Sequence, residues 1–379
     1  MLENGEAFFP ALEAAIAGAR ESVWLETYIF AGDAIGQRIR DALIAAAMRG
    51  VRIRLVIDGF GSRGRLPPDW WQPLESAGGE VRIYRRDHGW WPLKRTRLMR
   101  LHRKLCVIDG EIGFVGGINI EDDWNIPGQR AARFDFAVRI EGPLVVAMVF
   151  AMEKLWWRLN WRHPVEMLSC VRSHMHDEEL RPGMPGLRAA LLLRDNLRNR
   201  RTIERAYLRA IGHARKEIVI ANAYFLPGHR FRRALLLAAQ RGVRVKLLLQ
   251  GMVEYRLQHA ATRALYGPLL DAGIEIYEYQ PSHLHAKVAV IDGHWSTVGS
   301  SNIDPFSLFL AREANVAIED AHFTQTLSSR LVWALANHAS RIEAAAWRDQ
   351  SPFLRLKSWL AYGLVRWGMV VAGLLKQWE

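Results

Sequence analysis

Cysteine is scarce in this chain of 379 residues, which contains only Cys106 and Cys170 and no C-x-x-C spacing. This shortage argues against a structural zinc site and against a disulfide framework, so a reducing compartment is the default expectation. The chain also lacks the pattern of a signal peptide, because its first seven residues hold two glutamates and no basic residue.

Acidic residues are outnumbered, with 39 Asp and Glu against 51 Lys and Arg, which gives a net charge of +12 and a pI near 10. That charge favours an anionic partner, either nucleic acid or an anionic membrane surface. Hydrophobic residues make up 50% of the chain, so full cores are available and disorder is not expected. The length fits two domains of roughly 150–190 residues each.

One short pattern, H-x-K-x4-D with four apolar residues before the Asp, occurs twice. The members of the two copies are His102, Lys104 and Asp109, then His285, Lys287 and Asp292. A Gly-Gly or Gly-Ser pair and an asparagine follow in step, at Asn119 and Asn302, and all matched positions lie 183 residues apart. A single H-x-K is common, but two copies with matched flanking residues indicate a functional constellation.

Each copy predicts a short strand that starts near its lysine and enters a turn at Asp-Gly. Because alternate residues of a strand share a face, the histidine and the lysine of each copy project together. Two such units related by a pseudo-twofold axis would form one pocket with two imidazoles and two ammonium groups. That set suits a phosphate, with a nucleophile and a general acid on opposite sides of phosphorus. The alternative is that both histidines only cap strands in the core.

The doubled motif with G-[GS]-x-N resembles the phospholipase D superfamily, over residues 2 to 330 or so. Further segments are similar to bacterial cardiolipin synthases, most of all to the form without amino-terminal membrane helices. These segments are residues 26–30, 49–52, 221–227 and 298–305. The resemblance implies an α/β fold made of two duplicated phospholipase-D-like domains, each a mixed β-sheet flanked by helices, related by a pseudo-twofold axis.

The resemblance also implies the roles of the motif residues. In the family one histidine attacks phosphorus and forms a phosphohistidine, while the other protonates the leaving alcohol and then deprotonates the incoming one. These roles fall on His102 and His285, and we favour His102 as the nucleophile. The side chains expected to hold the non-bridging oxygens are Lys104, Lys287, Asn119 and Asn302. With these donors the chemistry implies no metal and no cofactor.

Four carboxylates complete the predicted site. Asp135 and Glu313 resemble the family's residues that pair with the histidines, and a surface salt bridge is the alternative for each. Asp109 and Asp292 belong to the catalytic motifs, but we expect them to stabilise the geometry of their own motif rather than to contact substrate.

Strands alternate with helices along the chain, which predicts a parallel or mixed sheet with helices on both faces. The expected helices are residues 6–20, 36–48, 70–77, 144–161 and 320–346, and the expected strands of the first half are 22–30, 51–57 and 81–84. The second half repeats this order, so a duplication is indicated. The expected division is a first domain at 1–170, a linker at 171–186, a second domain at 187–347 and a tail at 348–379.

Two segments predict contact with a membrane. The 17 residues between Tyr84 and His102 are basic and include Trp90 and Trp91, against 7 residues between Tyr277 and His285. An ordinary solvated loop is the alternative. Residues 359–378 are almost wholly apolar apart from two cations, which predicts an amphipathic helix in the membrane interface. A terminal helix packed on the domain is the alternative there.

The function implied by the resemblance is that of a cardiolipin synthase. Such an enzyme transfers a phosphatidyl group from one phosphatidylglycerol, or another phospholipid, to a second phosphatidylglycerol and releases glycerol. The expected partners are anionic phospholipids, including cardiolipin, and the membrane surface, and nucleic acid is not expected. The expected location is peripheral, on the cytoplasmic face of a bacterial cell membrane. The alternatives are a phospholipase D-type hydrolase, a superfamily nuclease or phosphodiesterase, and a non-catalytic membrane-binding scaffold.

Overall fold

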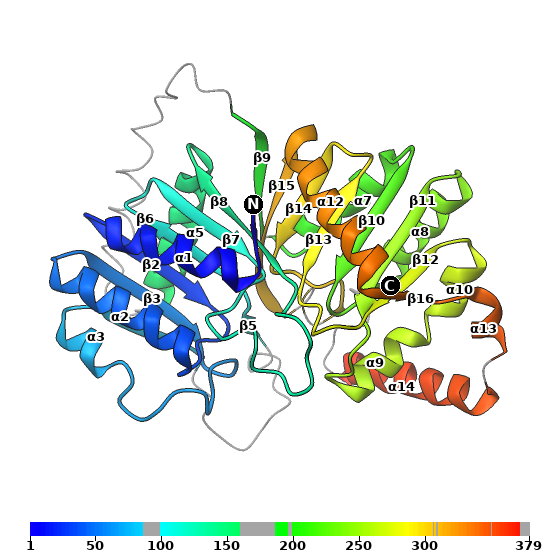
Figure 1. The fold of residues 1–379 in the computed structure, drawn as a ribbon, viewed down its shortest axis with the longest axis horizontal. Helices are drawn as coiled ribbons and strands as arrows, with labels where there is room; N and C mark the ends of the chain where they lie inside the picture. Colours follow the sequence, from blue (N-terminus) through cyan, green and yellow to red (C-terminus); the bar gives the residue numbers. More distant parts are fainter. Residues whose placement is uncertain are drawn as a thin grey trace.

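The computed structural model describes residues 1–85, 99–159, 186–195, 199–305, 307, 310–349 and 351–371. These residues form two β-sheets that lie side by side, each flanked by helices (Figure 1). The strands of the first sheet are β1 (Leu2–Glu3), β2 (Ser22–Thr27), β3 (Arg52–Asp58), β4 (Glu80–Tyr84), β6 (Leu105–Ile108), β7 (Ile112–Gly116) and β8 (Phe136–Glu141). Their order across the sheet is β1-β8-β7-β6-β2-β3-β4.

The second sheet repeats this arrangement with additional strands at its edges. Its strands are β5 (Arg100–Leu101), β9 (Arg188–Arg194), β10 (Glu217–Asn222), β11 (Arg244–Gln250), β12 (Glu275–Tyr279), β13 (Lys287–Ile291), β14 (Trp295–Gly299), β15 (Ala311–Glu319) and β16 (Ala339–Arg341). Their order is β16-β12-β11-β10-β13-β14-β15-β5, and β9 pairs with β15 as well. In each sheet three parallel strands are followed by an antiparallel meander, so both sheets are mixed. The prediction of a duplicated mixed α/β unit is confirmed.

The helices of each half cover both faces of its sheet. In the first half these are α1 (Asn4–Gly18), α2 (Ala34–Met48), α3 (Gln72–Ser76) and α5 (Leu144–Leu159). In the second half they are α7 (Thr202–His213), α8 (His229–Gln240), α9 (Arg256–Arg263), α10 (Tyr266–Asp271), α12 (Ala321–Asn337), α13 (Ala344–Arg348) and α14 (Pro352–Val371). The helices α2 and α12 begin at Asp33 and Asp320, whose carboxylates accept a backbone N–H three residues later and so cap the helix.

Three hydrophobic cores result, and the central one joins the two halves. It contains Val115 and Met148 of the first half together with Val298 and Leu331 of the second. The other two cores lie on the outer faces, one beneath α1 and α2 and one beneath α7, α8 and α14. Burial of apolar surface between the sheets therefore holds the two halves together, with the ends of their motif strands near the contact between them.

The predicted helix at residues 320–346 is wrong in its second part. Helix α12 ends at Asn337, and the next residues form β16, which pairs antiparallel with β12. Asn337, His338 and Ser340 favour helices only weakly, and the free edge of β12 offers hydrogen bonds to the extended chain. The predicted helix at 144–161 is present as α5, and the described part of that segment ends at Leu159.

Two predicted segments lie largely outside the described residues. These are the linker at 171–186, of which only residue 186 is described, and the loop that contains Trp90 and Trp91. The chain on the far side of that loop crosses between the halves, because β5 pairs in parallel with β15 of the second sheet. The halves therefore share a sheet edge just before His102.

A buried ion pair distinguishes the two halves. Arg103 lies 2.7 Å from Glu26, and both side chains are almost fully buried. At the matching positions of the second half stand Ala286 and Ala221. The second half thus lacks both members of the pair. This is expected, because either charge alone in the core would lower the stability of the fold.

This pair predicts a pattern of stabilities. Glu26→Ala and Arg103→Ala should each lower the free energy of unfolding by about 3–5 kcal/mol, because each leaves a buried charge without its partner. The double variant, which copies the second half, should lose clearly less than the two single losses combined. Denaturant unfolding of the three variants measures this, and simple additivity would contradict it.

Candidate active site

The two Asp-Gly pairs form the turns that position each motif. Asp109 and Asp292 have positive φ angles of 53° and 52°, a conformation that Asp tolerates, and a positive-φ glycine follows each. The carboxylate of Asp109 accepts backbone N–H groups from residues 20 to 22 at 2.8–2.9 Å. Asp292 accepts those of residues 215 to 217 at 2.7–2.9 Å.

These two aspartates therefore lie at the far ends of β6 and β13 from the histidines. Burial alone would raise the pKa of each carboxyl, but the three N–H donors lower it below its usual value. The sequence motif groups these aspartates with a histidine and a lysine, but in the structure they do not lie beside those residues. The structure places them as turn residues that hold the start of β2 and of β10 to the adjacent hairpin.

Each histidine is anchored by the other half of the molecule. The backbone N–H of His102 donates to the carbonyl of Arg312 at 2.9 Å, as a continuation of the β5–β15 pairing. The N–H of His285 donates to the carbonyl of Phe134 at 2.9 Å. Both histidines consequently lie at the contact between the two halves, where their imidazoles are only slightly exposed (14% and 16%).

The carboxylates that pair with the imidazoles are exchanged between the halves. Nδ1 of His102 lies 3.0 Å from Oε2 of Glu313, a residue of β15. Nδ1 of His285 lies 2.6 Å from Oδ2 of Asp135, just before β8. Both predicted pairing residues thus contact a histidine, and each pair spans the interface. With Nδ1 engaged in each ring, we expect Nε2 to be the atom that meets a substrate.

The first motif has Gly-Gly where the second has Gly-Ser. This difference follows the length of the carboxylate side chain that lies beside each pair. In the second copy Ser300 donates its hydroxyl to Oε2 of Glu313 at 2.5 Å. In the first copy Gly117 takes that place, and a Cβ there would lie 2.3 Å from Oδ1 of Asp135. The shorter carboxylate side chain comes closer to the backbone and requires the glycine.

Both motif lysines are buried beside the histidines. Lys104 donates to the carbonyl of His102 at 2.8 Å, and Lys287 donates to that of His285. Lys287 also lies 3.8 Å from Oδ2 of Asp135. One of the three ammonium donors of each lysine fixes its position, which leaves the others to bind an anion.

Burial dominates the electrostatics of the cationic groups. It lowers the pKa of Lys104 to about 7, with a further lowering by Lys287, whose charge is close by. Burial also lowers the pKa of Lys287 to about 8. The pKa values of His102 and His285 are lowered by burial too, so both imidazoles are neutral at neutral pH. An anion in the pocket would restore the charge of the lysines.

The two carboxylates differ in protonation. Burial raises the pKa of Asp135 to about 7, against the opposing effect of Lys287. Burial would also raise the pKa of Glu313, but His102, Lys104 and the Ser300 hydroxyl lower it below its usual value. Glu313 is therefore an ionised acceptor at neutral pH, whereas Asp135, with a pKa of about 7, is partly protonated there.

The lowered lysine pKa values predict a fall in activity at alkaline pH. In the free enzyme Lys104 and Lys287 lose their charge above about pH 7 and pH 8, so binding of the phosphate weakens. We expect kcat/KM to decrease as pH rises from 7 to 9. The decrease of kcat should begin at a higher pH than that of kcat/KM, because bound phosphate keeps the lysines charged. A kcat/KM that stays constant to pH 9 would contradict the prediction.

The two asparagines lie near the motifs, in different hydrogen-bonding situations. Asn119 accepts the N–H of Ile29 at 3.3 Å and donates to Glu121 at 3.2 Å, so its amide is partly engaged with protein. The side-chain oxygen of Asn302 is buried and has no hydrogen-bond partner among the described residues. Contact of either amide with a phosphate therefore stays a prediction.

Sequence reasoning missed a pair of residues that hold the motifs in place. Oδ2 of the buried Asp58 accepts the N–H of Leu101 at 2.7 Å, and Oε1 of Gln250 accepts that of Leu284 at 3.0 Å. Each bond fixes the residue directly before a motif histidine. The repeat contained the signal, because Asp58 and Gln250 lie 192 residues apart, the same offset as the neighbouring R-G-V-R segments.

An aromatic neighbour of His102 was missed as well. The ring of Tyr28 lies 4.8 Å from the imidazole of His102, and the ammonium of Lys104 lies 5.3 Å from the same ring. Burial raises the pKa of Tyr28, so its hydroxyl remains protonated. Tyr28 thus packs against the imidazole of His102 and near the ammonium of Lys104.

Together the fold and the site define a class. Two copies of one α/β unit meet at paired histidines and lysines, the arrangement of a phospholipase D-type enzyme that attacks a phosphodiester. A family described as "Cardiolipin synthase, PLD-like domain" matches residues 12–155 and 207–333. This chain belongs to the cardiolipin synthase family, within the phosphatidyltransferases of that superfamily.

Individual relatives agree with this assignment. The chain is 39% identical over 375 residues to cardiolipin synthase B of Escherichia coli K12, a match that covers 97% of this chain and 87% of that protein. It is 30% identical over 330 residues to the major cardiolipin synthase of Bacillus subtilis, with coverage of 87% and 67%. The crystal structure of phosphatidylserine synthase from Haemophilus influenzae has the same fold, with a TM-score of 0.70, 13% identity and coverage of 99% and 94%.

Proposed function

We propose that this chain transfers a phosphatidyl group from one phosphatidylglycerol to a second, forming cardiolipin and releasing glycerol. One observation carries the proposal. Each half contributes a histidine whose Nδ1 is bound by a carboxylate of the other half, beside two buried lysines. A phosphodiester bound between the imidazoles would face a nucleophile on one side and a proton donor on the other.

His102 has the tautomer of a nucleophile. Because Glu313 is ionised, it accepts a hydrogen bond from a proton that stays on Nδ1 of His102. The lone pair of the ring is therefore on Nε2. Nε2 attacks phosphorus, the bond from phosphorus to the glycerol oxygen breaks, and a phosphohistidine forms. The positive charge that develops on this imidazole is stabilised by the carboxylate of Glu313.

His285 has the tautomer of a general acid. A protonated Asp135 donates to Nδ1 of His285, which leaves the proton of the ring on Nε2. Nε2 gives this proton to the departing glycerol oxygen while Asp135 passes its own proton to Nδ1, so the ring stays neutral and Asp135 becomes ionised. In the second step Nε2 takes the proton of the incoming hydroxyl and Nδ1 returns its proton to Asp135, while the hydroxyl oxygen attacks phosphorus and displaces His102. The cycle ends with both histidines in their starting forms.

The lysines and asparagines hold the phosphate in this scheme. Lys104 and Lys287 bind the non-bridging oxygens, and the charge they regain on binding offsets that of the phosphodiester. Asn119 and Asn302 complete the set with neutral amide donors. These contacts strengthen as negative charge accumulates on the oxygens in the transition state.

Helix α14 supplies a surface for a membrane. One face packs on α9 and the outer core of the second half through Tyr362 and Met369. The other faces expose large apolar side chains, namely Phe353, Leu356, Trp359, Leu360, Leu364, Trp367 and Val370. The helix has no acidic residue, and its Arg355 and Lys357 are exposed. A basic helix with exposed tryptophans fits the interface of an anionic membrane.

The sequence allows two alternatives for this segment, a helix in the membrane interface and a helix packed on the domain. Helix α14 is compatible with both, because one face packs on the domain while the other faces are exposed. No helix in the described part of the chain is long and apolar enough to cross a bilayer. We propose that the protein binds the cytoplasmic face of a bacterial cell membrane from one side through α14. We also propose the division into domains at 1–170 and 187–347 with a membrane-associating tail at 348–379.

Removal of the exposed tryptophans should weaken membrane binding. Trp359→Ala combined with Trp367→Ala removes two side chains that would insert at headgroup depth, so affinity for phosphatidylglycerol vesicles should fall about tenfold or more. Vesicle sedimentation measures this. Trp333→Ala, on the exposed surface of α12, is the matched control and should bind normally. Equal affinity of the double variant and the control would contradict the role of α14.

The test of the proposed function uses purified full-length protein and vesicles of acyl-labelled phosphatidylglycerol. Formation of cardiolipin and glycerol in equal amounts is the expected result. Phosphatidic acid as the main product would indicate the hydrolase alternative. Cleavage of DNA without any lipid turnover would indicate the nuclease alternative, and vesicle binding without any turnover would indicate a scaffold.

A further inference from the structure

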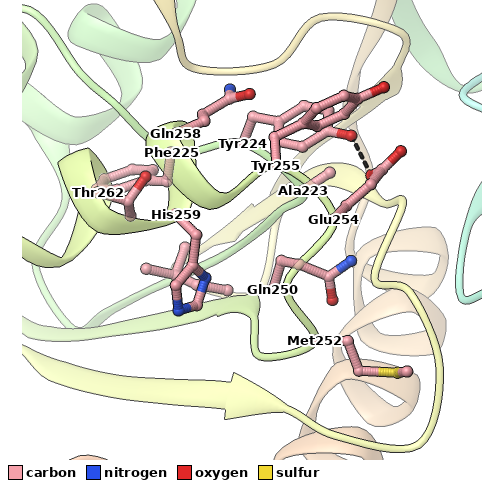
Figure 2. Close-up of a pocket in the computed structure, with 11 residues that line it drawn as sticks. Ala223, Tyr224, Phe225, Gln250, Met252, Glu254, Tyr255, Gln258, His259 and Thr262 are labelled. Atoms are coloured by element: carbon pink, nitrogen blue, oxygen red, sulfur yellow. Dashed lines mark hydrogen bonds between the residues drawn. The ribbon is translucent and has the colours of Figure 1, made fainter. Parts of the chain in front are cut away.

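A small pocket lies beside the catalytic cleft in the second half. Its walls come from the segment after β10, the end of β11 and the loop that follows it, and helix α9 (Figure 2). The side chains that matter here are Tyr224, Gln250, Glu254 and Tyr255. None of them belongs to the two H-x-K-x4-D motifs, and only Gln250 has a place in the site described above, as the residue that holds Leu284.

The polar part of the pocket centres on Glu254. The hydroxyl of Tyr224 donates to Oε2 of Glu254, and the ring of Tyr255 lies 5.9 Å from that of Tyr224 (Figure 2). Nδ1 of His283 lies 3.9 Å from the same carboxylate oxygen. Glu254 is about one third exposed (33%), so its carboxylate can accept further hydrogen bonds from a ligand.

The pocket is tied to the His285 side of the cleft. His283 stands two residues before His285, and Gln250, a wall of the pocket, accepts the N–H of the intervening Leu284. The negative charge of Glu254 reaches the catalytic lysine, since it raises the pKa of Lys287 against the effect of burial. Tyr255 in turn lies within electrostatic range of Tyr28, which packs on His102.

The alcohol reacts on the side of the site to which this pocket is linked through His283 and Leu284. In the proposed mechanism His285 protonates the leaving alcohol and deprotonates the incoming one, so both alcohols must lie next to its Nε2. A carboxylate on that side of the site, near enough to act on Lys287, repels a second phosphate or a carboxylate, but it accepts hydrogen bonds from hydroxyl groups. A Tyr hydroxyl and an imidazole provide further polar contacts of the kind a polyol requires.

We propose that Glu254, Tyr224 and His283 form the subsite that selects a polyol as leaving group and acceptor, by binding a hydroxyl adjacent to the reacting one. This inference rests on the proposed phosphatidyl transfer. It predicts that glycerol and the glycerol headgroup of phosphatidylglycerol react in preference to an alcohol that has only the reacting hydroxyl.

A competition experiment tests the subsite independently of the rate at which the phosphohistidine forms. Full-length protein is incubated with vesicles of acyl-labelled phosphatidylglycerol, deuterated glycerol and 1-propanol, and the two transfer products are separated by mass. Their ratio reports only how the intermediate divides between the two acceptors. The wild type should favour glycerol over 1-propanol.

Loss of the subsite should remove this preference. Glu254→Gln should lower the glycerol to propanol ratio about tenfold or more, since a hydrogen bond to a charged group is lost. Tyr224→Phe, which keeps the ring, should lower it by a smaller factor of about three. Glu275→Gln is the matched control, because Glu275 makes a similar bond to the hydroxyl of Tyr277 at 2.7 Å away from the pocket, and its ratio should equal that of the wild type.

The outcomes separate the two proposals. If the wild type transfers phosphatidyl groups but both variants keep its ratio, the subsite is wrong and the proposed function stands. If the wild type transfers to no alcohol at all, the proposed function fails and the subsite with it. Should Glu254→Gln not fold, the ratio of Tyr224→Phe decides, because that change removes only one oxygen.

Discussion

His102→Ala and His285→Ala should each lower phosphatidyl transfer by at least about a thousandfold, the largest effect expected from any single change in this chain. The first variant lacks the atom that bonds to phosphorus. The second lacks the proton donor for the leaving glycerol, and it also lacks the base for the incoming hydroxyl. The measurement is cardiolipin formation from phosphatidylglycerol vesicles, with His322→Ala as a control on the exposed surface of α12.

The same variants assign the order of the two histidines. A phosphatidyl ester of nitrophenol, whose leaving group needs no proton, lets the first step proceed without a general acid. With this donor His285→Ala should release about one equivalent of nitrophenol and accumulate labelled phosphohistidine, because no base activates the acceptor. His102→Ala should release none. The reverse pattern would make His285 the nucleophile and would overturn the tautomer assignment from Glu313 and Asp135.

Glu313→Gln should lower kcat about a hundredfold or more, with little change in KM. The carboxylate accepts the Nδ1 proton of His102 and balances the charge that this ring gains on attack, and a neutral amide cannot provide that charge. Single-turnover kinetics measure the step directly. Glu319→Gln changes an exposed carboxylate at the other end of β15 and serves as the control.

Asp135→Asn should behave differently, and the contrast tests the proposed protonation states. An amide can still donate to Nδ1 of His285 and so keep its tautomer, but it has no proton to lose near pH 7. We therefore expect kcat to fall, because the amide cannot pass a proton to Nδ1, and to lose the variation near pH 7 that the titration of Asp135 gives the wild type, whereas Glu313→Gln should keep that variation. An equal loss for the two variants, with the same pH dependence, would show that both carboxylates act in the same protonation state.

The exchange of carboxylates between the halves has a consequence for the fold. Neither half contains a complete imidazole–carboxylate pair, since His102 requires Glu313 and His285 requires Asp135. In the proposed mechanism the hydrophobic core shared by the two sheets therefore holds both pairs in register. A displacement of one half relative to the other would break both pairs at once, so we expect activity to be lost before either sheet unfolds.

The sequence by itself determined the duplication, the class of fold and the chemical groups of the site. These follow from local rules, because alternation along a strand places His102 and Lys104 on one face, and Asp-Gly predicts the turn that closes each motif. The predicted helix at 320–346 shows where local rules fail, since the edge of β12 recruits residues 339–341 into a strand.

Only the tertiary structure decided which carboxylate serves which histidine. The pairs join residues that are 211 and 150 positions apart in the chain, and no local spacing encodes such a contact. The same holds for Asp58 and Gln250, which contact the residues before the histidines because the parallel strands β3 and β11 end at the edge where the antiparallel strands β6 and β13 begin. Packing of two apolar sheet faces against each other sets these distances, and it depends on the shape of the whole core.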